Sequence, residues 1–290
     1  MSSCKLGADG IRVYAGLWWM AASTVLAVAL SMAIPGFSQE SKISKLTGEP
    51  KRGKELFRRY CIGCHGPEGN GEGENAPYLN PRPRDFTLGL FKCRSTLSGS
   101  IPLDKDLFDT ISRGIHGTFM PSWLALVPQQ RADLIAYIKT FSKRFQEEQP
   151  GEPIRIPAEI AETPESIERG RDLYKQLGCF ECHGPEGRGD GPAALTLRDA
   201  KGILAPPYNF YSSPPLKCGS TDGDIYRSLM TGLDGTPMPA YAFWLKPDQG
   251  WDLVHFLRSL GKRGRASATS LESAEIMRKD RESHDHTNHP

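Results

Sequence analysis

The sequence lacks a concentrated charge of either sign. Its 36 Lys and Arg residues nearly balance 34 Asp and Glu residues, leaving a formal net charge of +2, and there is no long basic stripe. Proteins that bind nucleic acid generally carry such a stripe, so we do not expect nucleic acid as a partner. The composition, 38% hydrophobic and 24% charged over 290 residues, is typical of a soluble globular protein of about two domains.

Charge is entirely missing between Arg12 and Glu40. The apolar run at 13–34 exceeds the ~7–15 residues of a signal peptide and reaches the ~20 needed to span a bilayer. Residues 1–40 are therefore predicted to be a membrane anchor or a removed signal peptide; a buried helix is the third reading. The first two readings leave the positive end inside and place the body in the periplasm or another extracytoplasmic space.

Four of the seven cysteines form two C-x-x-C pairs, each followed directly by histidine. This is the attachment pattern of c-type haem. Two thiols about one helical turn apart can add to the two vinyl groups of one haem, and the next residue can then bond the iron. A redox-active C-x-x-C does not need the histidine, and a zinc site would need both pairs in one fold. The pattern predicts two covalently bound haem c groups, at Cys61, Cys64 and His65 and at Cys179, Cys182 and His183.

The second half of the chain repeats the first, which sets the domain boundaries. Met120 in GTFMPSW and Met238 in GTPMPAY each lie 55 residues after the histidine of their own copy. Other matched blocks are RGKELFRRYC with RGRDLYKQLGC, PRDF with PYNF, and LFKCRST with PLKCGST.

The boundaries follow from these blocks. We name 48–145 the first repeat and 167–262 the second repeat. The Pro- and Glu-rich segment 146–166 is predicted to be a semi-stiff linker. The polar tail 263–290 is predicted to be mostly disordered, with a short helix near 271–279.

Three helices are expected in each repeat from apolar spacing and glycine stops. One runs from the RG pair into C-x-x-C-H, and a glycine on it should let a late helix approach closely while an aromatic residue fills the crossing. The late helices are expected at 128–143 and 247–260, and short helices before the methionine loops at 105–113 and 224–231.

Each half resembles a class I (mitochondrial-type) cytochrome c domain, over about 50–144 and 167–262. The resemblance implies an all-α fold, with a few short helices around one covalently bound haem in each of two tandem domains. It also implies axial iron ligation by His65 with Met120 and by His183 with Met238. Core filling is the alternative role of the two methionines.

Several other residues have open roles. Cys93 and Cys218 align in the repeat and are expected to bridge the two halves, to be small buried residues, or to bind one iron in place of methionine. Lys92 and Lys217 are expected to face solvent or to meet haem propionates, and Trp123 and Tyr241 to pack or to meet propionates. Unrepeated His116 and His255 are expected in surface or packing roles. The tail histidines His284, His286 and His289 are expected to be solvated.

These features predict an electron carrier that works between extracytoplasmic or membrane redox partner proteins. The alternatives are a haem-bearing subunit of a dehydrogenase or oxidase complex, and an oxidoreductase of the peroxidase or sulfur-compound oxidising kind if one haem opens or takes a cysteine ligand. Residues 51–148 hold 15 Lys and Arg against 11 Asp and Glu. We therefore expect the first repeat to meet an acidic partner.

Overall fold

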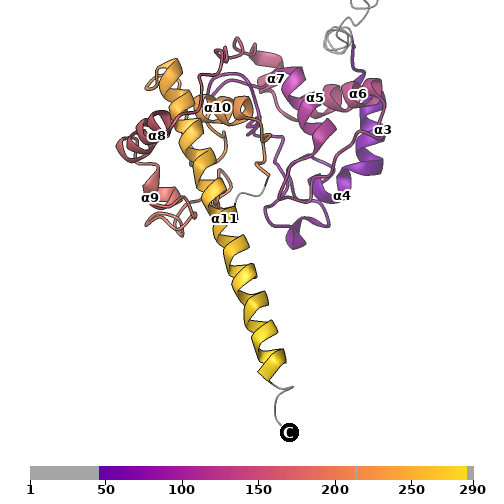
Figure 1. Ribbon diagram of the computed structural model, residues 1–290. Helices are drawn as coiled ribbons and strands as arrows, with labels where there is room; N and C mark the ends of the chain where they lie inside the picture. Colours follow the sequence, from indigo (N-terminus) through magenta and orange to yellow (C-terminus); the bar gives the residue numbers. More distant parts are fainter. Residues whose placement is uncertain (1–45, 213–214, 286–290) are drawn as a thin grey trace, which may run out of the picture. The chain divides into compact units, whose positions relative to one another are not determined.

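The computed structural model describes residues 46–212 and 215–285 (Figure 1). The predicted anchor or signal segment at 13–34 lies outside this range. Within the described residues, no helix is both long and apolar enough to cross a bilayer. The chain divides into the units Met1–Leu46 and Thr47–Pro290, and everything below concerns the second unit.

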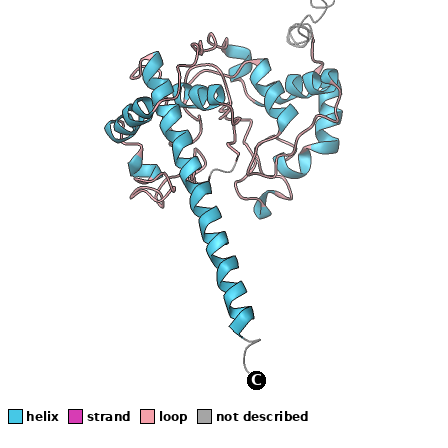
Figure 2. Ribbon diagram, in the orientation of Figure 1, coloured by secondary structure: helices cyan, strands magenta, loops and turns pink. Residues whose placement is uncertain are grey.

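The described part of the chain is helical and contains no strand, which confirms the predicted all-α class (Figure 2). Its only strand-like pairs there are two isolated bridges, Thr96 with Pro153 and Arg198 with Leu204. The helices of the first repeat and its C-terminal end are α3 (Pro50–Tyr60), α4 (Ile62–His65), η1 (Ala76–Tyr78), α5 (Asp104–Arg113), α6 (Pro128–Ile138), η2 (Lys139–Phe141) and α7 (Arg144–Glu147). Those that follow are α8 (Pro164–Gln176), α9 (Phe180–His183), α10 (Asp222–Thr231) and α11 (Pro247–Asp285).

In the first repeat, α3 crosses α6 at Gly53. A Cβ atom built on Gly53 would lie 2.0 Å from the carbonyl oxygen of Asp133, so only glycine allows this approach. The ring of Phe57, one turn later, lies 5.4 Å from the ring of Tyr137. Arg52 clamps the same crossing through a 2.8 Å bond from its Nε to the Asp133 carboxylate. The expected glycine contact and aromatic filler are both present.

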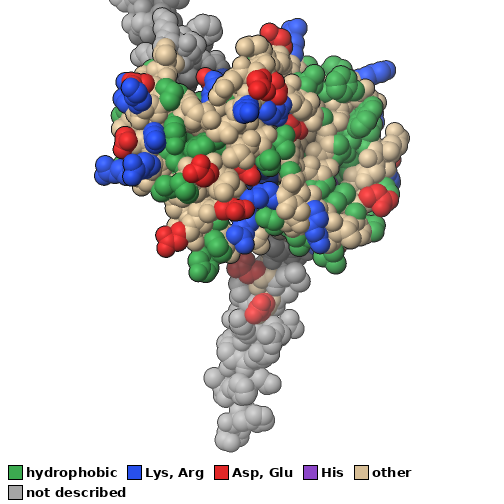
Figure 3. All heavy atoms as spheres, turned by 180° about the vertical axis from the view of Figure 1, so that it is seen from behind, with side chains coloured by type: hydrophobic (Ala, Val, Ile, Leu, Met, Phe, Trp, Pro, Cys, Tyr) green, Lys and Arg blue, Asp and Glu red, His purple; other side chains and the backbone are tan. Residues whose placement is uncertain are grey.

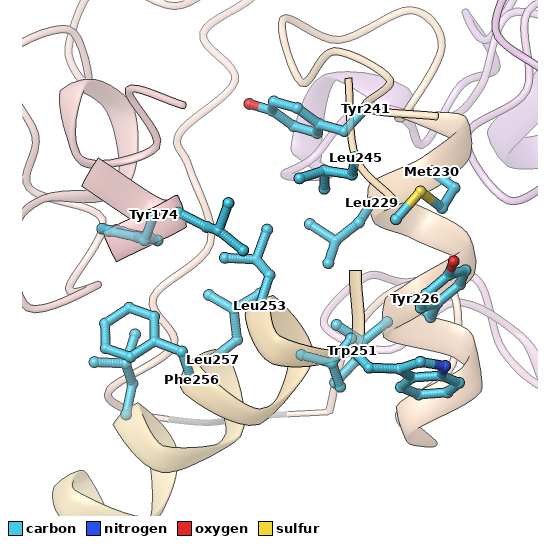
Figure 4. Packing of buried hydrophobic residues seen from close by; sticks show 14 residues of the cluster. Tyr174, Tyr226, Leu229, Met230, Tyr241, Leu245, Trp251, Leu253, Phe256 and Leu257 are labelled. Carbon is cyan, nitrogen blue, oxygen red and sulfur yellow. The ribbon is translucent and has the colours of Figure 1, made fainter. Parts of the chain in front are cut away.

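The second repeat has the same crossing between α8 and α11. A Cβ atom on Gly170 would lie 2.0 Å from the Asp252 carbonyl oxygen. The rings of Tyr174 and Phe256 lie 5.2 Å apart, and Arg169 Nε donates to Asp252 at 2.8 Å. Figure 4 shows Tyr174 and Phe256 beside the leucines of this core.

The tail differs from the expectation of disorder. Helix α11 does not end near residue 260 but continues to Asp285, the long yellow helix of Figure 1. No proline occurs between Pro247 and Pro290, and no glycine after Gly264. Because these are the residues that most disfavour helix interiors, the chain beyond Gly264 meets no break signal, although Gly261 and Gly264 lie inside the helix. The structure thus describes a helix where the polar composition predicted mostly disorder.

The two repeats are joined by covalent and ionic contacts. Cys93 and Cys218 form a disulfide with Cα atoms 5.0 Å apart, which selects the bridging role from the three considered. Buried Arg94 pairs with Asp234 at 2.8 Å and donates to the carbonyl oxygen of Thr231. These contacts hold the end of α10 and the loop after it against the first repeat.

On the face shown in Figure 3, Lys and Arg side chains lie among Asp and Glu side chains and do not gather into one large basic field.

Candidate haem-binding sites

The two C-x-x-C-H stretches each form a one-turn helix. Each histidine ends a one-turn helix, α4 or α9, and its N–H donates at 2.9 Å to the carbonyl oxygen of the first cysteine of its motif. The two cysteines and the histidine of each motif therefore lie on one helical turn. All four thiols, Cys61, Cys64, Cys179 and Cys182, are outside any disulfide.

Both histidine rings are oriented by a backbone carbonyl 19 or 25 residues later. His65 Nδ1 lies 3.1 Å from the Arg84 oxygen, and His183 Nδ1 lies 3.0 Å from the Tyr208 oxygen. Burial is the main cause that lowers the pKa of His65 and of His183, so both rings are neutral near pH 7. A carbonyl accepts only from N–H, which places the proton on Nδ1 and leaves a lone pair on Nε2. These residues therefore fit a haem iron, because an iron-binding histidine needs this tautomer.

A phenylalanine packs against each of these imidazoles. The Phe86 and His65 ring centroids are 4.5 Å apart, and those of Phe210 and His183 are 4.9 Å apart. These phenylalanines belong to the repeated blocks PRDF and PYNF, for which the sequence alone suggested no role. Their second position supplies the carbonyl and their fourth the ring, so the repeated Pro and Phe were the available signal.

The methionine loops are closed by the same bonds in both repeats. In the first, Ile115 N–H donates to Met120 O at 3.0 Å and Met120 N–H donates to Thr118 Oγ1 at 3.1 Å. In the second, Leu233 N–H donates to Met238 O at 3.2 Å and Met238 N–H donates to Thr236 Oγ1 at 3.3 Å. Each threonine hydroxyl in turn donates back into its loop. The loops therefore fix each methionine backbone, beyond what a core-filling side chain requires.

The thiols are set for a structural role. Burial raises the pKa of Cys61 to about 12 and that of Cys179 to about 11. Thiol–disulfide exchange needs a thiolate near neutral pH, so neither thiol suits a redox-active C-x-x-C.

The two aromatic residues after the methionines are inside their repeats. Trp123 Nε1 is buried without a hydrogen-bond partner in the described residues, while its ring packs 5.4 Å from Tyr60. Tyr241 is buried, and burial is the largest cause that raises its pKa, ahead of the charge of Cys179. The unpartnered indole N–H suits a haem carboxylate, and the ring contacts suit packing, so both expected roles fit.

The two unrepeated histidines, His116 and His255, are placed as predicted. His116 is exposed. His255 is buried in α11, and its Nδ1 lies 2.9 Å from Ser166 Oγ. One is a surface residue and the other a packed residue.

Comparisons with known proteins point to one family. A family model described as "Cytochrome c" matches the chain twice, over 50–142 and 167–261. The chain is 29% identical over 143 residues to a cytochrome c4 of Thiocapsa roseopersicina, covering 48% of this chain and only 61% of that protein. It is also 29% identical over 99 residues to a cytochrome c of Guizotia abyssinica, covering 32% of this chain and 89% of that protein.

A solved structure is similar over both repeats. It is a chain from the Kuenenia stuttgartiensis reducing HAO-like protein complex Kustc0457/Kustc0458, with 39% identity and a TM-score of 0.71. The match covers 73% of this chain and 96% of that chain. Since the two family matches together cover more than half of the sequence, this protein belongs to the cytochrome c family of electron-transfer proteins with covalently bound haem c.

Proposed function

We propose that the protein is a dihaem electron carrier with histidine and methionine on both irons. In the first repeat, Cys61 and Cys64 attach haem, and His65 and Met120 ligate its iron. In the second, Cys179 and Cys182 attach haem, and His183 and Met238 ligate its iron. The observation that carries this proposal is the matched histidine geometry, with Nδ1 held by a carbonyl oxygen in each repeat.

Haem supplies one-electron chemistry between ferrous and ferric iron. The chain's residues set the conditions for it. A neutral thioether favours the ferrous state, so methionine ligation raises the reduction potential. A histidine held by a backbone carbonyl and a methionine held by a closed loop would hold the iron with little movement of the chain. His65 with Met120, and His183 with Met238, would occupy the iron positions that a substrate would otherwise need.

The disulfide supports an extracytoplasmic location. Disulfides persist in oxidising compartments and are rare in the cytosol, and Cys93–Cys218 joins the two repeats. Export by the apolar segment at 13–34 is consistent with this, whether that segment is cut or retained as an inner-membrane anchor.

Substitution of the methionines tests the ligation. Met120→Ala and Met238→Ala should each abolish the long-wavelength charge-transfer band of one methionine-ligated ferric haem, lower one reduction potential and allow fast cyanide binding at one iron. Met230→Leu is the matched control, because Met230 is a buried core residue of α10. Wild-type protein that binds cyanide rapidly would contradict the proposal.

A second candidate function is that of an electron-transfer subunit in an enzyme complex. It is favoured by the similarity to nearly the whole length of a chain from the reducing HAO-like protein complex. Affinity purification of the native protein under mild conditions should then yield a stable partner protein. If the protein instead migrates as an isolated chain at its native concentration, the result would favour a free electron carrier.

A third possibility, an oxidoreductase with a cysteine-ligated haem, is disfavoured. Cys93 and Cys218 are bonded to each other, so neither sulfur is free to replace a methionine.

A further inference from the structure

Three cationic side chains from both repeats gather beside the disulfide. Lys92 and Lys217 directly precede Cys93 and Cys218, whose Cα atoms are 5.0 Å apart. The guanidinium of Arg84 lies against the second repeat, since a Cβ atom on Gly235 would be 2.7 Å from Arg84 Nη1. All three side chains are half-buried, so the expectation of solvent-facing lysines was wrong.

The three cations act on one another. Burial is the main cause that lowers the pKa of Lys92 to about 7, and repulsion by Arg84 and Lys217 adds to it. Burial, and then repulsion by Arg84, lowers the pKa of Lys217. The charges of Asp199, Asp85 and Asp234 attract Arg84. Asp199 also attracts Lys92, yet the net shift remains downward.

The nearby acids are already engaged by other groups. Asp234 pairs with Arg94 at 2.8 Å. The Asp85 carboxylate accepts from the N–H and the hydroxyl of Thr87. The Asp199 carboxylate accepts from the backbone N–H groups of Lys201 and Ile203. Among the described residues, no carboxylate forms a salt bridge with Arg84, Lys92 or Lys217 within 4.0 Å.

A small cavity opens at this cluster, lined by both repeats. Its charged lining consists of Arg82, Arg84, Lys92, Lys201, Asp85 and Asp199. Lys201 pairs with Glu72 at 2.9 Å, and Lys217 does not line the cavity itself. Half-buried cations are unfavourable without a counter-ion, so the cavity and the cations around it suit an anion.

We propose that Arg84, Lys92 and Lys217 form one anion site shared by the two repeats, which binds carboxylate or similar oxyanion groups. The inference rests on the proposed function, because haem c brings propionate carboxylates to each repeat; a free oxyanion such as phosphate is the other source of the same chemistry. An anion in this site balances the positive charge at the contact between the repeats. It also lets a change of charge in one repeat be felt in the other.

The test compares purified holoprotein variants Lys92→Gln, Lys217→Gln and Lys92→Arg. Lys105→Gln is the matched control, because Lys105 is an exposed lysine of the first repeat that pairs with Asp109. With an anion bound, Lys92→Gln and Lys217→Gln lower the Tm, since each leaves a half-buried anion unpaired. They also lower the equilibrium constant for reduction of at least one haem by about tenfold, which is 59 mV for a one-electron couple. Lys92→Arg retains most of both properties.

The opposite sign overturns the site. If no anion binds, Lys92→Gln removes an unpaired half-buried charge and raises the Tm or leaves it unchanged, with potentials equal to those of the control. If Lys92→Gln does not yield folded protein, Lys217→Gln carries the same expectation.

Phosphate titration at constant ionic strength distinguishes the two sources. A Tm that rises and potentials that fall with phosphate in wild type, but not in Lys92→Gln, identify a free anion. Values independent of phosphate, together with the lysine effects, identify the propionates. Haem content is measured on the same samples: fewer than two haems in wild type would refute the proposed function, whereas two haems with silent lysine variants would refute this site alone.

Discussion

Gly53→Ala is the substitution that most directly probes how the first repeat is built. The glycine lies in α3 where it meets α6. A Cβ atom there would lie 2.0 Å from the Asp133 oxygen and 2.8 Å from the Tyr137 Cβ atom. The first of these is a backbone atom inside a helix, so it cannot rotate away, and the two helices must separate.

The expected magnitude follows from two opposing effects. Alanine in a helix interior is more favourable than glycine by about 0.5–1 kcal/mol. Overpacking a well-packed contact costs about 1–3 kcal/mol, and separation also weakens the contact of Phe57 with Tyr137. Because the displaced atom is backbone, we take the upper part of that range, which leaves a net loss of about 2 kcal/mol and lowers the Tm of this repeat by roughly 10 °C.

The assay is thermal unfolding of the holoprotein, followed by circular dichroism and haem absorption. Gly170→Ala should reproduce the loss in the second repeat, where the Cβ atom would meet the Asp252 oxygen at 2.0 Å. Gly223→Ala in α10 is the control, since its Cβ atom would have no neighbour closer than 4.0 Å, and its stability should change by less than about 0.5 kcal/mol. A Gly53→Ala protein as stable as wild type would refute the described helix contact.

Three further predictions follow from the same structure. Replacing both Cys93 and Cys218 by serine should lower the free energy of unfolding in urea by up to about 4–5 kcal/mol, because the bridge closes a loop across 125 residues; an unchanged value would show that the bridge does not constrain the unfolded chain. Asp133 should contribute acid sensitivity: burial opposes its ionisation, but bonds from Arg52, Glu49 and Gln129 outweigh this and lower its pKa below 3.8. The stability that Asp133 contributes is therefore present above pH 3.8 and is lost as pH falls through the lower folded pKa. Asp133→Asn should flatten the acid part of the stability–pH curve. An unaltered curve would show that Asp133 is not a source of the acid sensitivity. The excess of Lys and Arg over 51–148 predicts that stopped-flow association with an acidic redox partner slows as salt is added, and a flat salt response would exclude electrostatic steering.

What could be predicted from the sequence was mostly what occurs twice. The C-x-x-C-H stretches, the methionine loops and the glycine contacts of Gly53 and Gly170 are each carried by side-chain identity at a fixed spacing. A pattern seen once has many explanations, whereas the same pattern at the same spacing in two halves of one chain has few. The helices before Gly114 and Gly232 were expected for the same reason and end there.

The rest depends on atoms or contacts that residue identity does not encode. Arg84 and Tyr208 act on histidine through backbone oxygen atoms, so their side chains gave no signal. The Arg94–Asp234 pair joins the repeats and has no counterpart within either one. The choice of a bridge for Cys93 also depended on how the repeats pack, and a spacing of 125 residues cannot reveal this.

The central claim is that two haems are bound covalently, one by each C-x-x-C-H stretch. Intact-mass measurement of protein matured in a host that attaches haem c tests it most directly. The account predicts the mass of the chain plus two haems in wild type, and of one haem when Cys61 and Cys64, or Cys179 and Cys182, are replaced by alanine. A wild-type mass with fewer than two haems, or a second haem retained after either pair is replaced, would contradict it.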